Sequence, residues 1–181
     1  MTMRHEIRIA GSGGQGIVTA GRILAKAAML CGRHATHSQA YGPQSRGGAS
    51  RSDVVISDRE IGYPLVQSAG VLVALTGEAL NRYRAEVGPG ARIIIDERAG
   101  VCGRSIDDDD VVLALVDTAR SISGGQLIAG VVSLGVIQGL ERIVDTDALI
   151  EAVRVGVPHR FRDENLWALQ AGLALVGSSV R

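Results

Sequence analysis

The sequence predicts an α/β fold: a three-layer, Rossmann-like α/β/α domain with a mostly parallel sheet and C-terminal helices. Three observations support this prediction. Short runs of aliphatic and β-branched residues alternate with helical patterns, a glycine-rich turn follows the first strand, and the pattern beyond residue 118 is helical throughout. Residues 1–181 are expected to form a single domain, since a chain of this length buries roughly 70 % of its unfolded surface without disulfides or metals.

Six segments are expected to be strands. The first alternates polar and apolar residues and stops at a glycine. From residue 53 onwards the expected strands are continuous apolar runs, which are typical of strands buried on both faces of a sheet. The expected strands cover residues 5–10, 34–39, 53–56, 71–75, 92–96 and 111–116.

Five segments have the spacing of helices. In the first, polar residues recur every three or four positions and leave a broad apolar face, and Gly32 ends the helix. The second stops before Gly88-Pro89-Gly90, and the fourth is capped by Asp145 or Thr146. The third is apolar almost all the way round, which favours a buried helix over a subunit interface. The expected helices cover residues 15–30, 78–86, 128–140, 147–155 and 164–176.

Composition and charge exclude several classes of protein. Lys and Arg number 19, as do Asp and Glu, so the chain lacks the basic excess that sequence-independent nucleic-acid binding requires. The most apolar stretch, residues 127–140, is shorter than the about 20 residues that span a membrane, and the N-terminus has no secretory signal. The two cysteines, Cys31 and Cys102, are too few for a four-cysteine iron–sulfur cluster, and we expect both to be buried. We also expect the side chain of Trp167 to pack against the rest of the domain. We therefore expect a cytoplasmic protein without a metal site that binds neither nucleic acid nor membrane.

A glycine-rich segment follows the first expected strand. Gly11-Ser12-Gly13-Gly14-Gln15-Gly16 fits the pattern G-x-G-x-x-G, in which glycine permits a tight turn and a close approach of the backbone to a ligand. The free N–H groups of the helix that follows favour an anionic ligand. A dinucleotide site needs an acidic residue about 20 positions later, and no Asp or Glu lies between Glu6 and Asp53. The segment predicts an anion site rather than an NAD(P) site, or alternatively a tight turn without a ligand.

A second loop precedes the third expected strand. It opens with the turn signal Tyr41-Gly42-Pro43, and Gly47-Gly48 permits backbone conformations that other residues avoid. Arg46 and Arg51 flank this glycine pair, and arginine side chains beside such a backbone suit a carboxylate or a phosphate. The alternative is that Arg46 is solvated and that Arg51 and Asp53 only mark the start of a strand.

The two loops together resemble those of a known family. The segments GSGGQG (residues 11–16) and YGPQSRGGASRSDVVIS (residues 41–57) are similar to the gamma subunit of 2-oxoacid:ferredoxin oxidoreductases, which act on pyruvate, 2-oxoglutarate or 2-oxoisovalerate. The similarity reaches the final helix, with a weaker match at Glu164-Asn165 and Ala168-Leu169, and looks closest to the 2-oxoglutarate type. A glutamate is common in the family where Gln44 stands, so the chain departs from the pattern there.

The resemblance implies a subunit that is not catalytic alone. Complexes of this family decarboxylate a 2-oxo acid on thiamine diphosphate, pass electrons through iron–sulfur clusters to ferredoxin and release an acyl-CoA. This chain has neither a thiamine-diphosphate motif nor cluster cysteines. The resemblance therefore places these cofactors on partners, namely thiamine-binding alpha and beta subunits and an iron–sulfur subunit. For the gamma-type domain it implies coenzyme A binding and subunit assembly.

The residues expected to contact coenzyme A come from both loops. The glycines would offer backbone N–H groups, and the two arginines would offer charge to the phosphates or to a carboxylate of a partner. The expected cofactor-binding residues are Gly11, Gly13, Gly14, Gln15, Gly16, Tyr41, Gly42, Arg46, Gly47, Gly48 and Arg51. Two alternatives stay open: a free-standing Rossmann-like nucleotide-binding module and a purely structural subunit. The sequence names neither the 2-oxo acid nor the final acceptor, ferredoxin or NAD.

Overall fold

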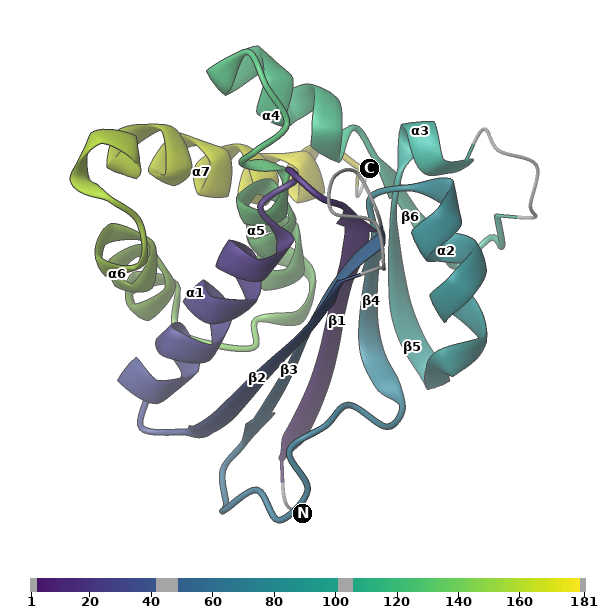
Figure 1. Cartoon of the computed structure of the whole chain (residues 1–181), viewed down its shortest axis with the longest axis vertical. Coiled ribbons are helices and arrows are strands. Elements are labelled where there is room, and N and C mark those ends of the chain that lie inside the picture. The colour runs from purple at the N-terminus through teal and green to yellow at the C-terminus, as the bar shows by residue number, and fades with distance from the viewer. Residues whose placement is uncertain (1–2, 42–48, 101–105, 180–181) are drawn as a thin grey trace.

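The computed structural model describes residues 3–41, 49–100 and 106–179, and this part of the chain contains one six-stranded sheet with helices on both faces (Figure 1). The strands are β1 (Arg4–Ser12), β2 (His34–Tyr41), β3 (Ala49–Ser57), β4 (Ala69–Ala74), β5 (Val87–Asp96) and β6 (Val111–Leu113). The α-helices are α1 (Ile17–Leu30), α2 (Gly77–Tyr83), α3 (Glu97–Gly100), α4 (Leu115–Ser123), α5 (Ala129–Glu141), α6 (Thr146–Gly156) and α7 (Arg162–Ser179). Two short 3₁₀ helices, η1 (Arg84–Glu86) and η2 (His159–Phe161), complete the described elements.

The strands lie in the order β2-β3-β1-β4-β5-β6. β1, β4, β5 and β6 pair in parallel, whereas β3 pairs antiparallel with both β1 and β2. Of the six described strands, five therefore run in one direction, which confirms the mostly parallel sheet that the sequence predicts. The pairing of β3 with β1 ends at Ser12↔Ala49, so the start of β3 lies beside the glycine loop that follows β1.

Helices cover the two faces of the sheet unequally. α1, α5, α6 and α7 pack on one face and α2 and α3 on the other, with α4 near the upper edge (Figure 1). The larger apolar core joins the first group of helices to side chains such as Ile7 and Ile56. The smaller core joins α2 to Leu72 and Ile95 on the opposite face. The predicted three layers and C-terminal helices are thus confirmed.

α5 runs through the helical layer as the buried helix that the sequence predicts. Its first ten residues are all buried. Contact with α7 depends on glycine, because a Cβ at Gly135 would lie 2.2 Å from the carbonyl oxygen of Leu169, and one at Gly172 would lie 2.0 Å from that of Val132. The backbones of the two helices therefore meet at a separation that a side chain at either glycine would prevent. No described helix combines the length and the apolarity needed to cross a membrane.

The expectation that residues 111–116 form a single strand is wrong. β6 ends at Leu113, and α4, which no sequence pattern predicted, begins two residues later. The reason is a distant partner: one carboxylate oxygen of Asp96 accepts a hydrogen bond from the N–H of Val116 (2.8 Å), and the other accepts one from the N–H of Arg98 (3.0 Å). Asp96 thus satisfies free N–H groups at the starts of α3 and α4. Its complete burial raises its pKa.

Four smaller expectations are also corrected. α1 begins at Ile17 rather than Gln15, because Gly16 has a left-handed backbone that a helix interior does not allow. Gly88-Pro89-Gly90, expected only to stop a helix, forms the start of β5. Trp167 is 58 % exposed on α7 instead of packed, and Cys31 is only partly buried. Cys102 lies outside the described residues.

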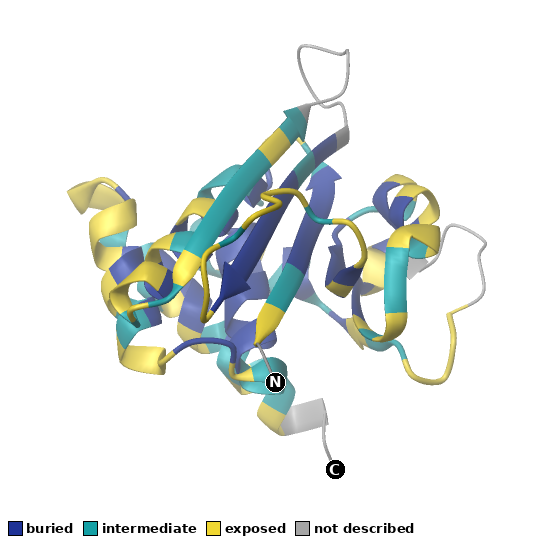
Figure 2. Ribbon diagram, turned by 90° about the horizontal axis from the view of Figure 1, so that it is seen from below, coloured by how far each residue is buried: buried dark blue, intermediate teal, exposed yellow. Residues whose placement is uncertain are grey.

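The segment joining β3 to β4, residues 58–68, crosses the face of the sheet opposite α1 (Figure 2). Glu6 on β1 holds it, because its carboxylate accepts hydrogen bonds from the backbone N–H groups of Gln67 (2.7 Å) and Ser68 (3.0 Å). Burial acts to raise the pKa of Glu6, but these hydrogen bonds and Arg4 outweigh it and lower the pKa. The loop of residues 58–68, fixed to the carboxylate of Glu6, therefore covers part of this face of the sheet.

Candidate functional site

The glycine loop lies at the edge of the sheet formed by the ends of β1 and β4. After β1 the chain turns to α1 on one face, and after β4 it turns to α2 on the other (Figure 1). Loops that diverge in this way leave a crevice at the carboxyl ends of parallel strands, where α/β proteins bind ligands. Among the described residues, α1 has no side-chain cap and no acidic residue in its first turn. Its N-terminus is therefore open to an anionic group.

Gln15 gives the glycine loop its shape. The side chain is 3 % exposed, and its Oε1 accepts a hydrogen bond from the backbone N–H of Ser12 (2.8 Å). A Cβ at Gly11 would lie 2.3 Å from the same oxygen, so only glycine leaves room for this inward position. The structure thus turns Gln15 into the loop, whereas Gly13 and Gly14 are exposed.

The loop is also held by the start of α5. The N–H of Gly130 donates a hydrogen bond to the carbonyl oxygen of Gln15 (2.9 Å). Gly16 has φ +70°, and a Cβ there would lie 2.1 Å from the carbonyl oxygen of Leu127. A Cβ at Gly130 would in turn lie 2.7 Å from the carbonyl oxygen of Gly16. Two backbones meet at van der Waals distance here, so the loop and residues 127–130 form one packed unit.

A small cavity of about 200 Å³ opens beside this unit. Backbone and hydroxyl groups from the loop, the first turn of α1 and the start of β3 surround it. It is lined by Ser12, Gly13, Gly14, Gly16, Ile17, Val18, Thr19, Ser50 and Leu127. Glycine backbone and a helix N-terminus without acidic side chains can hold a phosphate or carboxylate.

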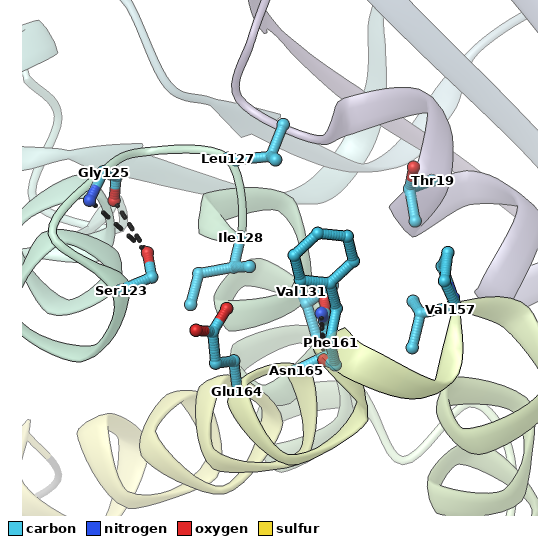
Figure 3. Close-up of a pocket in the computed structure, with 11 residues that line it drawn as sticks. Thr19, Ser123, Gly125, Leu127, Ile128, Val131, Val157, Phe161, Glu164 and Asn165 are labelled. Carbon is cyan, nitrogen blue, oxygen red and sulfur yellow. Dashed lines mark hydrogen bonds between the residues drawn. The ribbon is translucent and has the colours of Figure 1, made fainter.

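A larger cavity of about 420 Å³ lies between α1, α5 and α7 (Figure 3). Most of its lining is apolar, and Glu164 and Asn165 from the first turns of α7 add polar groups. It is lined by Thr19, Ser123, Gly125, Leu127, Ile128, Val131, Val157, Pro158, Phe161, Glu164 and Asn165. Both cavities share Thr19 and Leu127, so they adjoin. Sequence reasoning missed this cavity, and the family match at Glu164-Asn165 was its one signal.

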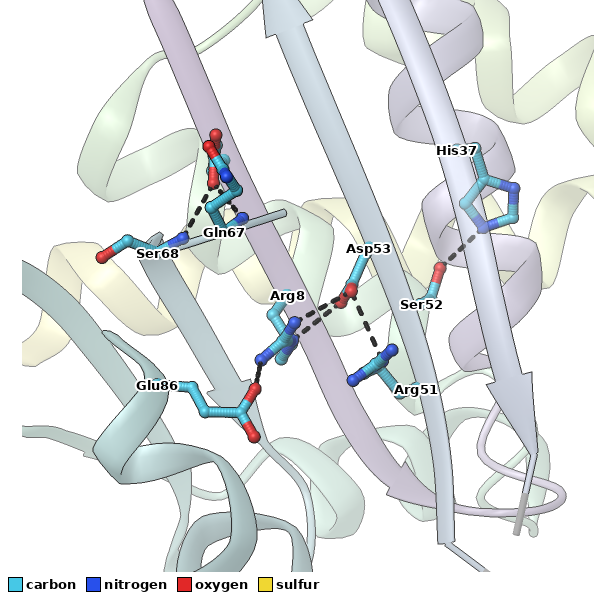
Figure 4. Close-up of polar contacts among 9 residues, drawn as sticks. Arg8, His37, Arg51, Ser52, Asp53, Gln67, Ser68 and Glu86 are labelled. Carbon is cyan, nitrogen blue, oxygen red and sulfur yellow. Dashed lines mark hydrogen bonds and ion pairs between the residues drawn. The ribbon is translucent and has the colours of Figure 1, made fainter. Parts of the chain in front are cut away.

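Arg51 lies on the other face of the sheet, away from the glycine loop cavity (Figure 4). Its Nε is 3.3 Å from Oδ2 of Asp53. Asp53 also receives two hydrogen bonds from the buried Arg8 (2.8 and 3.0 Å), and Arg8 pairs with Glu86 as well. Both guanidinium groups lie over the ring of Tyr83, 4.9 Å (Arg8) and 5.6 Å (Arg51) from its centre. Arg51 is therefore paired with Asp53 within this chain, and its neighbour Ser50, not Arg51, lines the glycine-loop cavity.

The remaining expected site residues belong to the second loop. Tyr41 ends β2, and its backbone pairs in register with Ser50. Gly42, Arg46, Gly47 and Gly48 lie outside the described residues, as does Gln44. Because Tyr41 and Ser50 flank this loop, both of its ends lie at the edge of the sheet that carries the glycine loop.

His37 has a structural role on the α1 side of the sheet. Its Nε2 is 2.8 Å from the hydroxyl of Ser52 (Figure 4), and a Cβ at Gly21 of α1 would collide with both side chains. Burial, followed by the charge of Arg22, lowers the pKa of His37. No group of three potential metal ligands occurs within the described residues.

Comparison with known proteins gives a consistent set of relatives. The family model described as pyruvate ferredoxin/flavodoxin oxidoreductase matches residues 6–175. The 2-oxoglutarate synthase subunit KorC of Methanothermobacter thermautotrophicus is 40 % identical over 96 % of each chain. The ketoisovalerate oxidoreductase subunit VorA of the same organism is 36 % identical over 92 % of this chain and 35 % of its own length. The crystal structure of a keto/oxoacid ferredoxin oxidoreductase gamma subunit from Geobacter sulfurreducens matches with a TM-score of 0.84 and 34 % identity over 98 % of both chains.

Proposed function

Because this chain belongs to the pyruvate ferredoxin/flavodoxin oxidoreductase family, we propose that its glycine-loop edge binds coenzyme A within a 2-oxoacid:ferredoxin oxidoreductase. The chain is a gamma subunit of such an enzyme, as the sequence resemblance predicted. The proposal assigns thiamine diphosphate to alpha and beta partner subunits, the iron–sulfur clusters to a further subunit, and the electrons to ferredoxin in the cytoplasm. Whole-length similarity to a 2-oxoglutarate synthase subunit favours 2-oxoglutarate as the oxo acid.

One observation carries the coenzyme A assignment: the uncapped N-terminus of α1 and the exposed backbone of Gly13 and Gly14 border the same cavity. Coenzyme A carries an anionic diphosphate between a slim pantetheine arm and an adenosine 3′-phosphate, and peptide N–H groups at a helix start suit the charge of the diphosphate. The residues of this chain would bind and orient coenzyme A. Decarboxylation and electron transfer belong to the partner subunits in this proposal.

A dinucleotide fits the same edge less well. In a dinucleotide-binding fold, an acidic residue at the end of the second strand holds the ribose. Here β2 ends at Tyr41, and the sequence has no Asp or Glu between Glu6 and Asp53. The antiparallel strand β3 lies between β1 and β2, and the residue of β3 that reaches the glycine-loop cavity is Ser50. The chain therefore lacks an acidic residue at the position that NAD requires, and a free-standing dinucleotide-binding module has no support from the geometry.

The test adds one negative charge to the glycine loop. A Cβ at Gly14 would have no atom within 4 Å, so a side chain there points into open space. Gly14→Asp and Gly14→Asn introduce side chains of equal size, and both residues tolerate positive φ better than most. Only the first adds charge, and two like charges about 4 Å apart in water repel by about 1 kcal/mol, or about fivefold in affinity.

The assay uses the complex purified through a tag on this chain. Gly14→Asp should raise the KM for coenzyme A about fivefold above that of Gly14→Asn, with the KM for the 2-oxo acid the same in both. Equal coenzyme A KM values for the two variants would show that the phosphates do not lie at this loop. The same preparation tests the partners, since bound iron and thiamine diphosphate should co-purify with the tagged chain.

A further inference from the structure

We propose that the outer edge of β2, together with the basic side of α1 beside it, binds an extended acidic segment of a partner subunit, which adds a strand to the sheet. This inference rests on the assembly of the chain with partner subunits in the proposed function, and not on coenzyme A binding. Three features carry it: an edge strand without the usual protection, unpaired cations next to it, and the absence of acidic residues from this part of the chain.

β2 is an edge strand with an open row of backbone groups. It pairs with β3 over eight consecutive residues, and every second residue of such an antiparallel strand directs its N–H and C=O away from the sheet. Apart from this pairing, the backbone of residues 34–41 forms no hydrogen bond with a described residue. Figure 1 shows β2 on the outside of the sheet next to α1. The outward groups can therefore pair with one further strand.

This edge lacks the features by which proteins prevent strand pairing. Charged side chains, proline, bulges and short length commonly protect an edge strand. The sequence of β2, HATHSQAY, contains no Asp, Glu, Lys, Arg or Pro, and its register with β3 is unbroken. The opposite edge strand, β6, has only three residues, so its length protects it. The contrast between the two edges indicates that β2 is the edge that receives a partner.

Two unpaired cations lie on the side of α1 next to β2. α1 packs on β2, since a Cβ at Gly21 would lie 2.7 Å from Nε2 of His37. Burial and then the charge of Arg22 lower the pKa of His37, which places Arg22 near the same strand. Lys26 follows one turn later on this side of the helix, and exposed Met29 follows after another turn. Arg22 and Lys26 are exposed and form no ion pair or hydrogen bond with a described residue, so both charges are available to a partner.

The charge of this surface decides which partner it fits. Residues 7–52, which include α1 and β2, contain no Asp or Glu. A second copy paired through β2 about a twofold axis would bring α1 next to its own counterpart, so Arg22 and Lys26 would face like charges. A partner strand with Asp or Glu at alternating positions would instead direct these carboxylates to the α1 side of the sheet. The surface therefore fits an acidic strand of another subunit rather than a second copy.

Charge reversal tests the basic side of α1. Arg22→Glu and Lys26→Glu keep good helix formers in α1, and each replaces attraction to a carboxylate by repulsion. Each should weaken the binding of this chain to its partner subunits about tenfold or more. The control is Arg59→Glu, because Arg59 is an exposed cation of the segment that crosses the other face, and its side chain has no partner among the described residues. Arg59→Glu should stay within about twofold of the wild type. Dilution of the purified complex, followed by its native mass, measures the affinity.

Hydrogen–deuterium exchange of the wild type tests the strand pairing without a substitution. In the isolated full chain the outward N–H groups of residues 34–41 have no strand partner and should exchange fast. In the purified complex a paired strand should slow their exchange about tenfold or more. Residues 111–113 form the other edge of the sheet and should exchange alike in the chain and in the complex.

Several results would overturn the inference. Equal exchange of residues 34–41 in the chain and in the complex would show that no strand pairs with β2, and slowed exchange confined to residues 111–113 would put the partner at the other edge. Affinities unchanged by both Arg22→Glu and Lys26→Glu would exclude an acidic partner segment. Slow exchange of residues 34–41 in an isolated chain with the mass of a dimer would put a second copy at this edge.

Failure of the proposed function gives a different result. A wild-type chain that retains no partner subunit, and therefore no iron or thiamine diphosphate, would refute the assembly on which this inference rests. A complex that protects residues 34–41, but has equal coenzyme A KM values for Gly14→Asp and Gly14→Asn, would support the inference and refute the coenzyme A site alone.

Discussion

A single methyl group at Gly16 probes how the glycine loop is built. Gly16 (φ +70°) and Gly14 (φ +90°) both have left-handed backbones, and an L-residue in that conformation costs about 1–2 kcal/mol. They differ in their surroundings: a Cβ at Gly16 would lie 2.1 Å from the carbonyl oxygen of Leu127, whereas one at Gly14 would have nothing within 4 Å. Gly16→Ala must therefore also displace backbone, and overpacking of this kind costs typically about 1–3 kcal/mol.

The expected free energies follow directly. Gly14→Ala should destabilise the chain by about 1–2 kcal/mol, and Gly16→Ala by about 2–5 kcal/mol, the sum of both costs. For a domain of this size, each kcal/mol corresponds to about 2–4 °C in Tm. Urea unfolding of the purified full chain, followed by circular dichroism, measures the difference between the variants. Equal unfolding free energies would show that Gly16 does not meet Leu127 and that the loop and α5 are not one unit.

Three further predictions test other parts of the account. Arg46→Ala should raise the KM for coenzyme A more than that for the 2-oxo acid, with exposed Arg59→Ala as the control; unchanged KM values would remove Arg46 from the site. Asp96→Asn should lower the free energy of unfolding by about 1–3 kcal/mol, because an amide nitrogen cannot accept the N–H of Arg98 or Val116; equal stability in urea would contradict this role. Glu6 has a lowered pKa, so its contribution to stability should be complete above its ordinary value of 4.5 and be lost as pH falls through the lower folded value. Unfolding between pH 3 and 6 should show this slope in the wild type and less of it in Glu6→Gln, and identical slopes would refute it.

Much of the fold is local and could be predicted from the sequence. β1 and the glycine loop follow from alternation that stops at a glycine, and the burial of α5 follows from its lack of a polar face. α4 could not be predicted in this way, because an apolar run fits a strand as well as a buried helix. Its start depends on Asp96, which lies 20 residues earlier in the chain.

In the candidate site, too, the local features could be predicted from the sequence and the features that depend on distant segments could not. The glycines were identifiable because their spacing reports a backbone requirement, and the start of α1 follows them directly. The larger cavity was not, because its walls come from segments more than 100 residues apart that meet only after folding. For Arg51, alternation along β3 puts its side chain on the same face as that of Asp53, so the sequence already contained the ion pair that the structure shows.

Hydrogen–deuterium exchange of the purified complex with and without coenzyme A tests the central claim most directly. Bound coenzyme A should slow exchange in residues 12–19, which border the glycine-loop cavity, and leave residues 58–68 on the opposite face unchanged. Unchanged exchange in residues 12–19 at saturating coenzyme A, or protection confined to other segments, would contradict binding at the glycine loop.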